Sequence, residues 1–396
     1  MNVEALPAAR RGVEMTNPLA LLETCARQKI AELKAGKAIG GGRNGPHNHP
    51  EPPLRNAAHW SIMFSRLYKL TGRDEYLMGA RLAYSVLTED PALRAGRVPV
   101  LRYIANDPAN GVIGLAWLIE SLIITAEALQ CDWGYETARK IATLPGFDWQ
   151  VGFWKTSKPN GEIAGIDPTP NHQLWFAMAL SMVPDKDSET SDRLCRFVQC
   201  FPDYLQLTPD RLISHLANNT GIEKLDRAQK SVNLMRITPI NALVRRVGWL
   251  HPRLRRLINY YTYATEKEVG YHIFNMHAIA RLKRYGIKFD NMDERMAAAI
   301  ETIHAPKYRK TLENNKWGYP YNPPGFEVPM VLLTFAESDP RSIEAARYYY
   351  DKQLKLTYDM ASTCFDRNNP DPNTLSARLY TLSLLELDEL ERISRS

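Results

Sequence analysis

Apolar positions along this chain recur mostly at helical spacing. Between Tyr76 and Leu87, for example, apolar residues lie three or four positions apart, as they do on one face of a helix. Alternation of apolar and polar residues over five or more positions, which would indicate a strand, is scarce. The pattern therefore predicts an all-α protein.

Six polar, aromatic-rich loops divide the helical pattern, and each is followed by a helix start and an apolar helix. The six starts lie near Pro53, Pro108, Pro170, Tyr271, Pro324 and Pro372. Successive differences between these positions are 55, 62, 101, 53 and 48 residues. A period of about 50 residues is too long for one helix and fits a helical hairpin, which is the signature of an internal repeat.

Ordinary amphipathic helices are expected between the six apolar ones. They are predicted over Pro18–Leu33, Arg73–Leu87, Trp133–Leu144, Ser188–Cys200, Asn291–Ile303 and Arg341–Leu354. Six inner and six outer helices are the number that an (α/α)6 toroid needs, in which one ring of helices covers another. We expect one such domain over residues 1–396, either closed or incomplete.

The third helix start shows why helices begin at these points. In the string DPTPNH, Thr169 can cap the helix, and Pro170 can take its first position, where the missing N–H costs nothing. Asn171 and His172 then fall in the first turn, where free N–H groups and the helix dipole favour an anion. This start is therefore a candidate site for an anionic group.

Composition places the chain among globular proteins. With 44% apolar and 24% charged residues, 396 residues can bury a substantial core. The most apolar run, Val112–Ala128, contains Glu120 and Glu127, so no membrane span is expected. The five cysteines are scattered without a CxxC pattern, and the first residues lack the apolar core of a signal peptide. These features favour a cytoplasmic protein.

The net charge of +6 is unevenly placed. An arginine cluster lies within the one overlong interval, so we interpret residues 205–265 as an inserted basic segment. The arginines of the cluster are Arg245, Arg246, Arg253, Arg255 and Arg256. Such a segment could grip an anionic polymer or touch an anionic membrane surface, and it could equally be a solvated helix face. No nucleic-acid-binding motif accompanies it, so no nucleic-acid partner is expected.

The first loop carries the densest group of polar residues. His47, His49 and Glu51 alternate there and could hold a metal, but zinc sites usually draw ligands from a helix or a CxxC-type turn. We therefore predict no metal and no cofactor, and instead expect hydrogen bonding and stacking to a sugar. The residues expected to bind it are Asn44, His47, His49, Arg55, His59, Trp60, Trp175, His272, Asn275, Trp317, Tyr319, Tyr321 and Arg378.

Four strings in these loops carry a resemblance. NGPHNHPEPPLRNAAHW, DPTPNHQLWFA, GYHIFNMHAIARL and YPYNPPGFEVP resemble a group of six-hairpin proteins found in surface-glycan gene clusters. That resemblance covers most of the chain and implies a carbohydrate-active role. The hairpin period, Asn171-His172 and Tyr271-His272 are in addition similar to the toroids of heparinase II/III-type and alginate-type polysaccharide lyases.

The lyase resemblance implies β-elimination from a uronate. Asn171, with an arginine such as Arg55, would neutralise the carboxylate, and Tyr271 or His172 would abstract the neighbouring proton. Neutral tyrosine is a poor base at its ordinary pKa of about 10. A neighbouring cation would therefore have to lower the pKa of Tyr271.

Other reactions remain open. A glycoside hydrolase would need two carboxylates across the scissile bond, and Asp167 with Glu327 are the best candidates, followed by Glu51 and Asp107. A uronosyl C5-epimerase would share the proton abstraction without cleaving a bond, and a toroid that only binds a glycan or an isoprenoid-linked glycan would do neither. We expect an enzyme acting on acidic glycans, with elimination ahead of hydrolysis. The catalytic candidates are Tyr271, His172, Asn171, Asp167 and Glu327.

Overall fold

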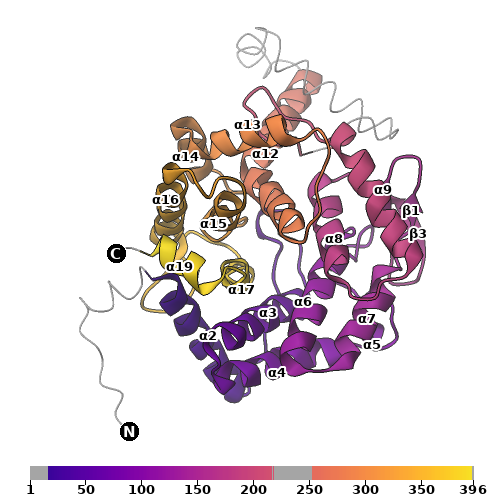
Figure 1. Ribbon diagram of the computed structural model, residues 1–396, viewed down its shortest axis with the longest axis vertical. Helices are drawn as coiled ribbons and strands as arrows, with labels where there is room; N and C mark the ends of the chain where they lie inside the picture. The colour runs from indigo at the N-terminus through magenta and orange to yellow at the C-terminus, as the bar shows by residue number, and fades with distance from the viewer. Residues whose placement is uncertain (1–16, 216, 218–251, 395–396) are drawn as a thin grey trace.

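Six inner helices form a closed ring in the computed structural model, which describes residues 17–215, 217 and 252–394, with side chains from 261 onward in the last range (Figure 1). Each inner helix packs against the next, and the last packs against the first. The inner helices are α3 (Leu54–Thr71), α6 (Ile113–Leu129), α8 (Pro170–Met182), α12 (Pro252–Arg284), α15 (Pro324–Phe335) and α17 (Pro372–Ala377), the last continued by α18 (Tyr380–Ser383). The prediction of an all-α (α/α)6 toroid is confirmed.

Outer helices cover this ring. They are α2 (Pro18–Lys34), α4 (Asp74–Glu89), α7 (Asp132–Ala142), α9 (Ser188–Tyr204), α13 (Asp293–His304), α16 (Pro340–Thr357) and α19 (Leu387–Ile393), with the short helices η1 (Gly45–His47), α5 (Pro91–Arg94) and α14 (Pro306–Glu313) between elements. The two rings differ in burial as their sequences predict. Helix α6 is buried on nearly all sides, whereas α7 buries a single stripe of small and apolar residues.

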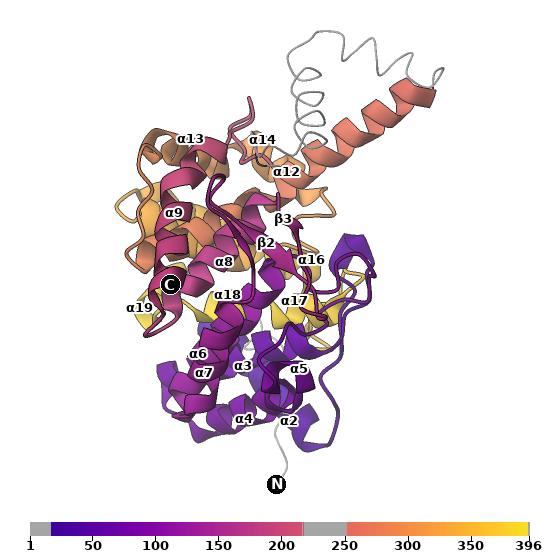
Figure 2. The same ribbon diagram turned by 90° about the vertical axis from the view of Figure 1, so that its right-hand side faces the viewer.

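Five of the six predicted helix starts are confirmed to within a few residues, and the sixth is wrong. Helix α12 begins at Pro252, so Tyr271 lies well inside it (Figure 2). Gly270 directly precedes the predicted start, and the helix continues through it. A Cβ at position 270 would lie 2.6 Å from the backbone carbon of Trp317, so this glycine permits a close approach of the loop before α15.

A small antiparallel sheet, which the sequence pattern did not predict, precedes α8. Its strands are β1 (Phe147–Asp148), β2 (Phe153–Ser157) and β3 (Ile163–Ile166), paired in that order. β1 and β3 are too short to show alternation over five positions, and the five residues of β2, FWKTS, do not alternate between apolar and polar. The sheet matters because β3 ends directly before Asp167 and so delivers that carboxylate to the start of α8.

The ring is closed by a contact between its first and last hairpins. Asp371, at the start of α17, accepts hydrogen bonds from the backbone N–H groups of Arg43, at 2.8 Å, and Gly45, at 3.1 Å. The same carboxylate caps α17 through the N–H of Thr374. One buried carboxylate therefore holds the loop that carries His47 against the last inner helix.

Two further predictions concerned a membrane span and a basic segment. In the described part of the chain, no helix is both long enough and apolar enough to cross a membrane. The five clustered arginines of the proposed basic segment 205–265, from Arg245 to Arg256, lie outside the residues whose side chains are described.

Candidate active site

A cavity of about 290 Å³ opens at the end of the ring where the inner helices begin. Every inner hairpin contributes to its wall, as the repeated polar loops led us to expect. The polar side chains that line it are Asn44, His47, Arg102, Asp107, Asn110, Thr156, Asp167, Thr169, Asn171, His172, His215, Lys267, Tyr271, Tyr321, Asn322 and Arg378. Its volume is close to the lower end of the usual range for ligand pockets, about 300–1,000 Å³.

His172 and Asp167 form a hydrogen-bonded pair in the cavity wall. Oδ2 of Asp167 lies 2.7 Å from Nδ1 of His172. Asp167 also accepts hydrogen bonds from the backbone N–H groups of Val112, at 3.0 Å, and Thr169, at 3.2 Å. Burial by itself would raise the pKa of Asp167, but His172 and these N–H groups bring it below its ordinary value. An ionised carboxylate only accepts, so the proton sits on Nδ1, and Nε2 of His172 is the basic nitrogen.

Gly111 holds the backbone tightly against this pair. Its φ of +58° is one that L side chains rarely adopt, and an added Cβ would lie 2.5 Å from Nδ1 of His172 and closer still to Oδ2 of Asp167. The neighbouring N–H of Gly111 donates to Asp107 at 2.7 Å. Two successive backbone N–H groups, those of Gly111 and Val112, thus hold the carboxylates of Asp107 and Asp167 on the same edge of the cavity.

A second wall is formed by His47 and two tyrosines. Nε2 of His47 lies 3.3 Å from the hydroxyl of Tyr271, and the hydroxyl of Tyr321 donates to Oδ1 of Asn44 at 2.7 Å. Burial, with the positive charge of Lys267 nearby, lowers the pKa of His47 to about 3, so its imidazole is neutral. His47 therefore presents a neutral imidazole to the cavity.

The structure corrects the expected role of Tyr271 as a base. Burial raises the pKa of Tyr271 well above its ordinary value, although the ammonium group of Lys267 lies 5.8 Å from the ring centre. The condition for a tyrosine base is not met, because the cost of removing the phenolate from water outweighs the lowering effect of Arg55 on this pKa. Tyr271 is a hydrogen-bonding group rather than a base at neutral pH.

Lys267 is a cavity cation that lies among aromatic rings and a histidine. Its Nζ lies 3.3 Å from Nε2 of His215 and above the rings of Tyr263, at 4.7 Å, and Trp317, at 5.1 Å. Burial, with the positive charge of Arg102 nearby, lowers the pKa of Lys267 to about 8. Because an ammonium group can only donate, Nε2 of His215 accepts, which places the ring proton of His215 on Nδ1.

Comparison with known proteins gives one relative and several structures. No protein-family model matches the chain. It is 29% identical over 381 residues to "Archaeal glycosylation protein Q" of Haloferax volcanii, which covers 94% of this chain and 98% of that protein.

Several solved structures of sugar-processing enzymes are similar to this chain in fold. Cellobiose 2-epimerase from Spirochaeta thermophila is 13% identical with a TM-score of 0.56, over 94% of this chain and 98% of that one. A D-mannose isomerase is 11% identical with a TM-score of 0.53, over 92% and 97%. An unsaturated glucuronyl hydrolase specific for heparin is 11% identical with a TM-score of 0.53, over 94% and 96%. This chain has the toroid fold of those sugar-processing enzymes. The lyase similarity is not shown by these comparisons and stays a prediction.

The structure brings eight of the predicted site residues to the cavity. They are Asn44, His47, Asp167, Asn171, His172, Tyr271, Tyr321 and Arg378. Glu327 is not among them. It is fully buried and paired with Arg378, and burial raises the pKa of Glu327 to about 7 against the opposing effect of that arginine. The predicted hydrolase pair of Asp167 and Glu327 therefore does not meet in the cavity.

The remaining predicted residues lie behind or beside the cavity wall. Arg55 is paired with Glu51 at 2.9 Å and stacks on Trp117. The rest pack or bond within the protein. His49 stacks beside His47, His59 on Tyr380, Trp60 on Phe64 and Trp175 on Phe274. His272 is hydrogen-bonded to the backbone of Ile213 and Ala299, and Asn275 to the backbone of Tyr271. Trp317 lies beside His47, and Tyr319 is buried.

The sequence pattern missed several lining residues. Arg102 lies in the second of the six loops, and it pairs there with Asp107 and donates through Nε to the carbonyl of the same residue at 2.7 Å. Lys267 lies in the string EKEVGYH, only four residues before Tyr271. This helical spacing could have indicated that Lys267 shares a face with Tyr271. His215 lies within the predicted insertion, and no signal in the sequence connects it to the site.

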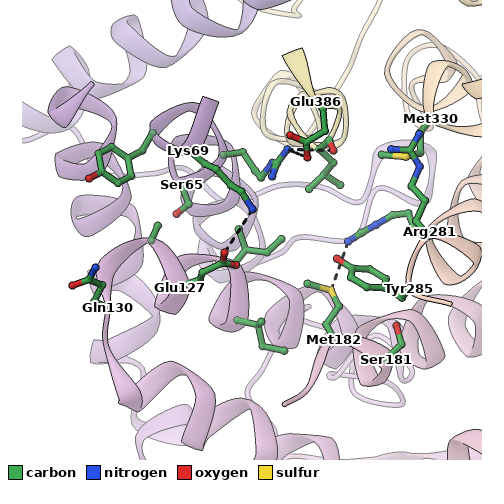
Figure 3. Close-up of a pocket in the computed structure, with 17 residues that line it drawn as sticks. Ser65, Lys69, Glu127, Gln130, Ser181, Met182, Arg281, Tyr285, Met330 and Glu386 are labelled. Atoms are coloured by element: carbon green, nitrogen blue, oxygen red, sulfur yellow. Dashed lines mark hydrogen bonds and ion pairs between the residues drawn. The ribbon is translucent and has the colours of Figure 1, made fainter. Parts of the chain in front are cut away.

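A second cavity, of about 640 Å³, lies at the opposite end of the ring, where the inner helices end, and Figure 3 shows the residues that line it. Figure 3 shows its charged side chains largely engaged with one another, Lys69 with Glu127 for example. Arg281 reaches away to the buried Glu120. Arg281 and Arg284 lie in the last turn of α12, where basic residues offset the negative end of the helix dipole, so a structural role accounts for them. Among the described lining residues of this cavity there is no histidine, so the first cavity is the better candidate active site.

Proposed function

We propose that this protein is a sugar isomerase or epimerase that moves a proton at the carbon beside a sugar carbonyl. The observation that carries the proposal is the Asp167–His172 pair in the cavity wall. Names of related proteins support it, since the fold is shared with an epimerase and an isomerase of sugars, and the relative is named for glycosylation.

The proposed chemistry follows from the residues. Nε2 of His172 takes the proton from the carbon, and Asp167 keeps the ring in the tautomer that permits this and stabilises the imidazolium that forms. The electron pair moves onto the carbonyl oxygen, and the ammonium group of Lys267 stabilises the resulting enediolate. Return of the proton to the neighbouring carbon, while the proton of the hydroxyl on the first carbon passes to the former carbonyl oxygen, gives an isomer of the aldose–ketose kind. Delivery of a proton to the opposite face of the same carbon, from a water molecule that neutral His47 can hold, gives an epimer, and His172 then releases its proton to the hydroxide that remains.

Hydrolysis fits the described site less well. Two carboxylates should flank the scissile bond, roughly 5–5.5 Å apart for retention or 6.5–9.5 Å for inversion. The carboxylates among the described lining residues, Asp107 and Asp167, are held on one edge by adjacent backbone N–H groups, and Asp167 is occupied by His172. Elimination would use the same base as isomerisation, so the product distinguishes the two.

The test is proton exchange in deuterated water. The protein is incubated with aldoses, ketoses and free hexuronates, and proton NMR follows deuterium entering the carbon beside the carbonyl together with any new sugar. We expect exchange with one substrate class, and His172→Gln should lower its rate by about 10²–10⁴-fold. His304→Gln, a change of the same kind on the outer helix α13, should leave the rate unchanged.

Three results would overturn the proposal. Unsaturated uronates without isomers would indicate elimination, shortened saturated oligosaccharides would indicate hydrolysis, and exchange that survives His172→Gln would remove the proposed base.

A further inference from the structure

Three residues that line the active-site cavity carry buried hydrogen-bonding atoms that have no partner among the described residues. Both amide atoms of Asn171, Nε of Arg378 and the indole Nε1 of Trp117 are buried and without a hydrogen bond among the described residues. All three residues line the cavity, and each is at least nine-tenths buried, with 1%, 1% and 3% of its surface exposed. We call these three residues the donor floor.

Unpartnered groups are informative only where a ligand can reach them. The indole N–H of Trp175 is also buried without a partner, but Trp175 lies in the packed interior and does not line the cavity. The donor floor differs because its groups come from three inner helices, α6, α8 and the end of α17, and meet at one cavity. Leaving such groups without a hydrogen-bond partner is unfavourable, so a bound molecule that satisfies them gains affinity.

The donor floor favours a ligand group that accepts hydrogen bonds. Three donor nitrogens, in Trp117, Asn171 and Arg378, stand against a single acceptor, Oδ1 of Asn171. A sugar hydroxyl bound among these donors would still need an acceptor for its own O–H, whereas an ionised carboxylate only accepts hydrogen bonds. The start of α8 contributes in the same sense, because its dipole favours an anion.

The charges of the lining agree with an anionic ligand. Arg102, Lys267 and Arg378 are cations, and Asp107 and Asp167 are the carboxylates among the described lining residues. Two of the three cations are already paired, Arg102 with Asp107 and Arg378 with Glu327. Lys267 has no ion-pair partner among the described residues and is therefore the cation available to a carboxylate ligand, while the ionised Asp167 is engaged with His172.

We propose that the donor floor binds the carboxylate of a hexuronic acid. Trp117, Asn171 and Arg378 each donate one N–H to its oxygens, and Oδ1 of Asn171 accepts from a neighbouring sugar hydroxyl. The inference deepens the proposed function and rests on it for the ligand being a sugar. It adds that the sugar carries a carboxylate, which neither the fold nor the Asp167–His172 pair requires.

The test compares ligands that differ in one group. Calorimetric titration of the full-length protein measures binding of D-glucuronate, D-galacturonate and D-mannuronate, of the three matching neutral hexoses, and of their 6-phosphates. We expect at least one hexuronate to bind tenfold or more tightly than its hexose and its 6-phosphate. Equal binding of the hexose would overturn the proposal, and tighter binding of the 6-phosphate would replace the carboxylate by a phosphate.

Two variants locate the effect at the donor floor. Asn171→Asp keeps the size of the side chain but adds a negative charge, so it should weaken the hexuronate by tenfold or more and change the neutral hexose by less than threefold. Trp117→Phe removes one N–H and should weaken the hexuronate several-fold. Trp175→Phe is the matched control, since it removes an equally unpartnered N–H outside the cavity and should change nothing. Equal effects of the two tryptophan variants would overturn the assignment.

Failure of this inference can be told apart from failure of the proposed function. A hexuronate that binds selectively without deuterium exchange would retain the carboxylate site and refute the reaction. Exchange with a neutral hexose as fast as with its hexuronate would retain the reaction and refute the carboxylate site.

Discussion

Replacing Gly111 by alanine should disable the active site while leaving the fold intact. Gly111 lies at φ +58°, and the new Cβ would come within 2.5 Å of Nδ1 of His172 and closer still to Asp167. Gly72, at the end of α3, offers a matched control, because it has φ +67° and no atom lies within 4 Å of the place that its new methyl group would take. Both substitutions impose the same backbone strain, but only one pushes on the Asp167–His172 pair.

The size of each effect follows from these distances. A left-handed conformation costs an L residue roughly 1–2 kcal/mol, so Gly72→Ala should lower the free energy of unfolding by about that amount. Gly111→Ala should cost the same and in addition displace His172, since ordinary contacts begin at 3.4 Å and the methyl group would lie at 2.5 Å. A displacement of the reacting groups by about 1 Å can reduce the rate by about 10²-fold.

Three measurements check this reasoning. Urea unfolding gives the stability of both variants, and deuterium exchange gives their activity. Nitrogen-15 NMR of the His172 ring reports which nitrogen carries the proton, and it does so whether or not a substrate is known. We expect the proton to stay on Nδ1 in Gly72→Ala and to lose its fixed position in Gly111→Ala.

One result would refute the argument. If Gly111→Ala matched Gly72→Ala in activity and in the nitrogen spectrum, the close packing of Gly111 against the Asp167–His172 pair would have no functional meaning.

Three other outcomes follow from buried groups. Glu120→Gln removes the charge opposite Arg281, and breaking a buried pair in this way should cost about 3–5 kcal/mol of unfolding free energy, measured in urea. A loss below about 1 kcal/mol would show that the arginine finds another partner. Asp371→Asn weakens the acceptor for the N–H groups of Arg43 and Gly45, so it should loosen the loop that carries His47 and lower kcat more than stability, which paired kinetic and unfolding measurements would show. Burial lowers the pKa of His272 to about 4, so the unfolded chain takes up this proton first. Stability from this group is complete above about pH 6.5 and falls as the pH drops toward 4, by about 2 kcal/mol at pH 5. The pH dependence of unfolding should therefore flatten in His272→Gln, and an unchanged slope would contradict the assignment.

Much of the fold could be predicted because its signals are local. A proline at the first position of a helix and a polar loop before it depend on a few neighbouring residues, so Pro170, Pro324 and Pro372 each mark a true helix start. The failure at Tyr271 has the same origin. Gly270 is a local signal for a break, but here the close approach of Trp317 from another hairpin explains the glycine.

The site was harder to predict, because cavity and interior look alike in one sequence. Trp117 and Trp175 both follow a helix start by a few residues on apolar helices, yet one lines the cavity and the other packs against Phe274. The difference is the rotation of each helix about its axis, which packing against neighbouring hairpins decides. Glu327 lies on α15 and pairs with Arg378 behind the wall, whereas Asp167 lies in the loop between β3 and α8 and lines the cavity.

The closure of the ring through Asp371 has a consequence for the order in which the site forms during synthesis. Asp371 and Arg43 are 328 residues apart, so their hydrogen bond cannot exist until nearly all inner hairpins have left the ribosome. Contacts this distant in sequence form late, because a long loop must be closed first. Earlier hairpins can pack pairwise, but the loop bearing His47 waits for its carboxylate. A nascent chain halted before α17 should therefore be largely helical and still have no working cavity.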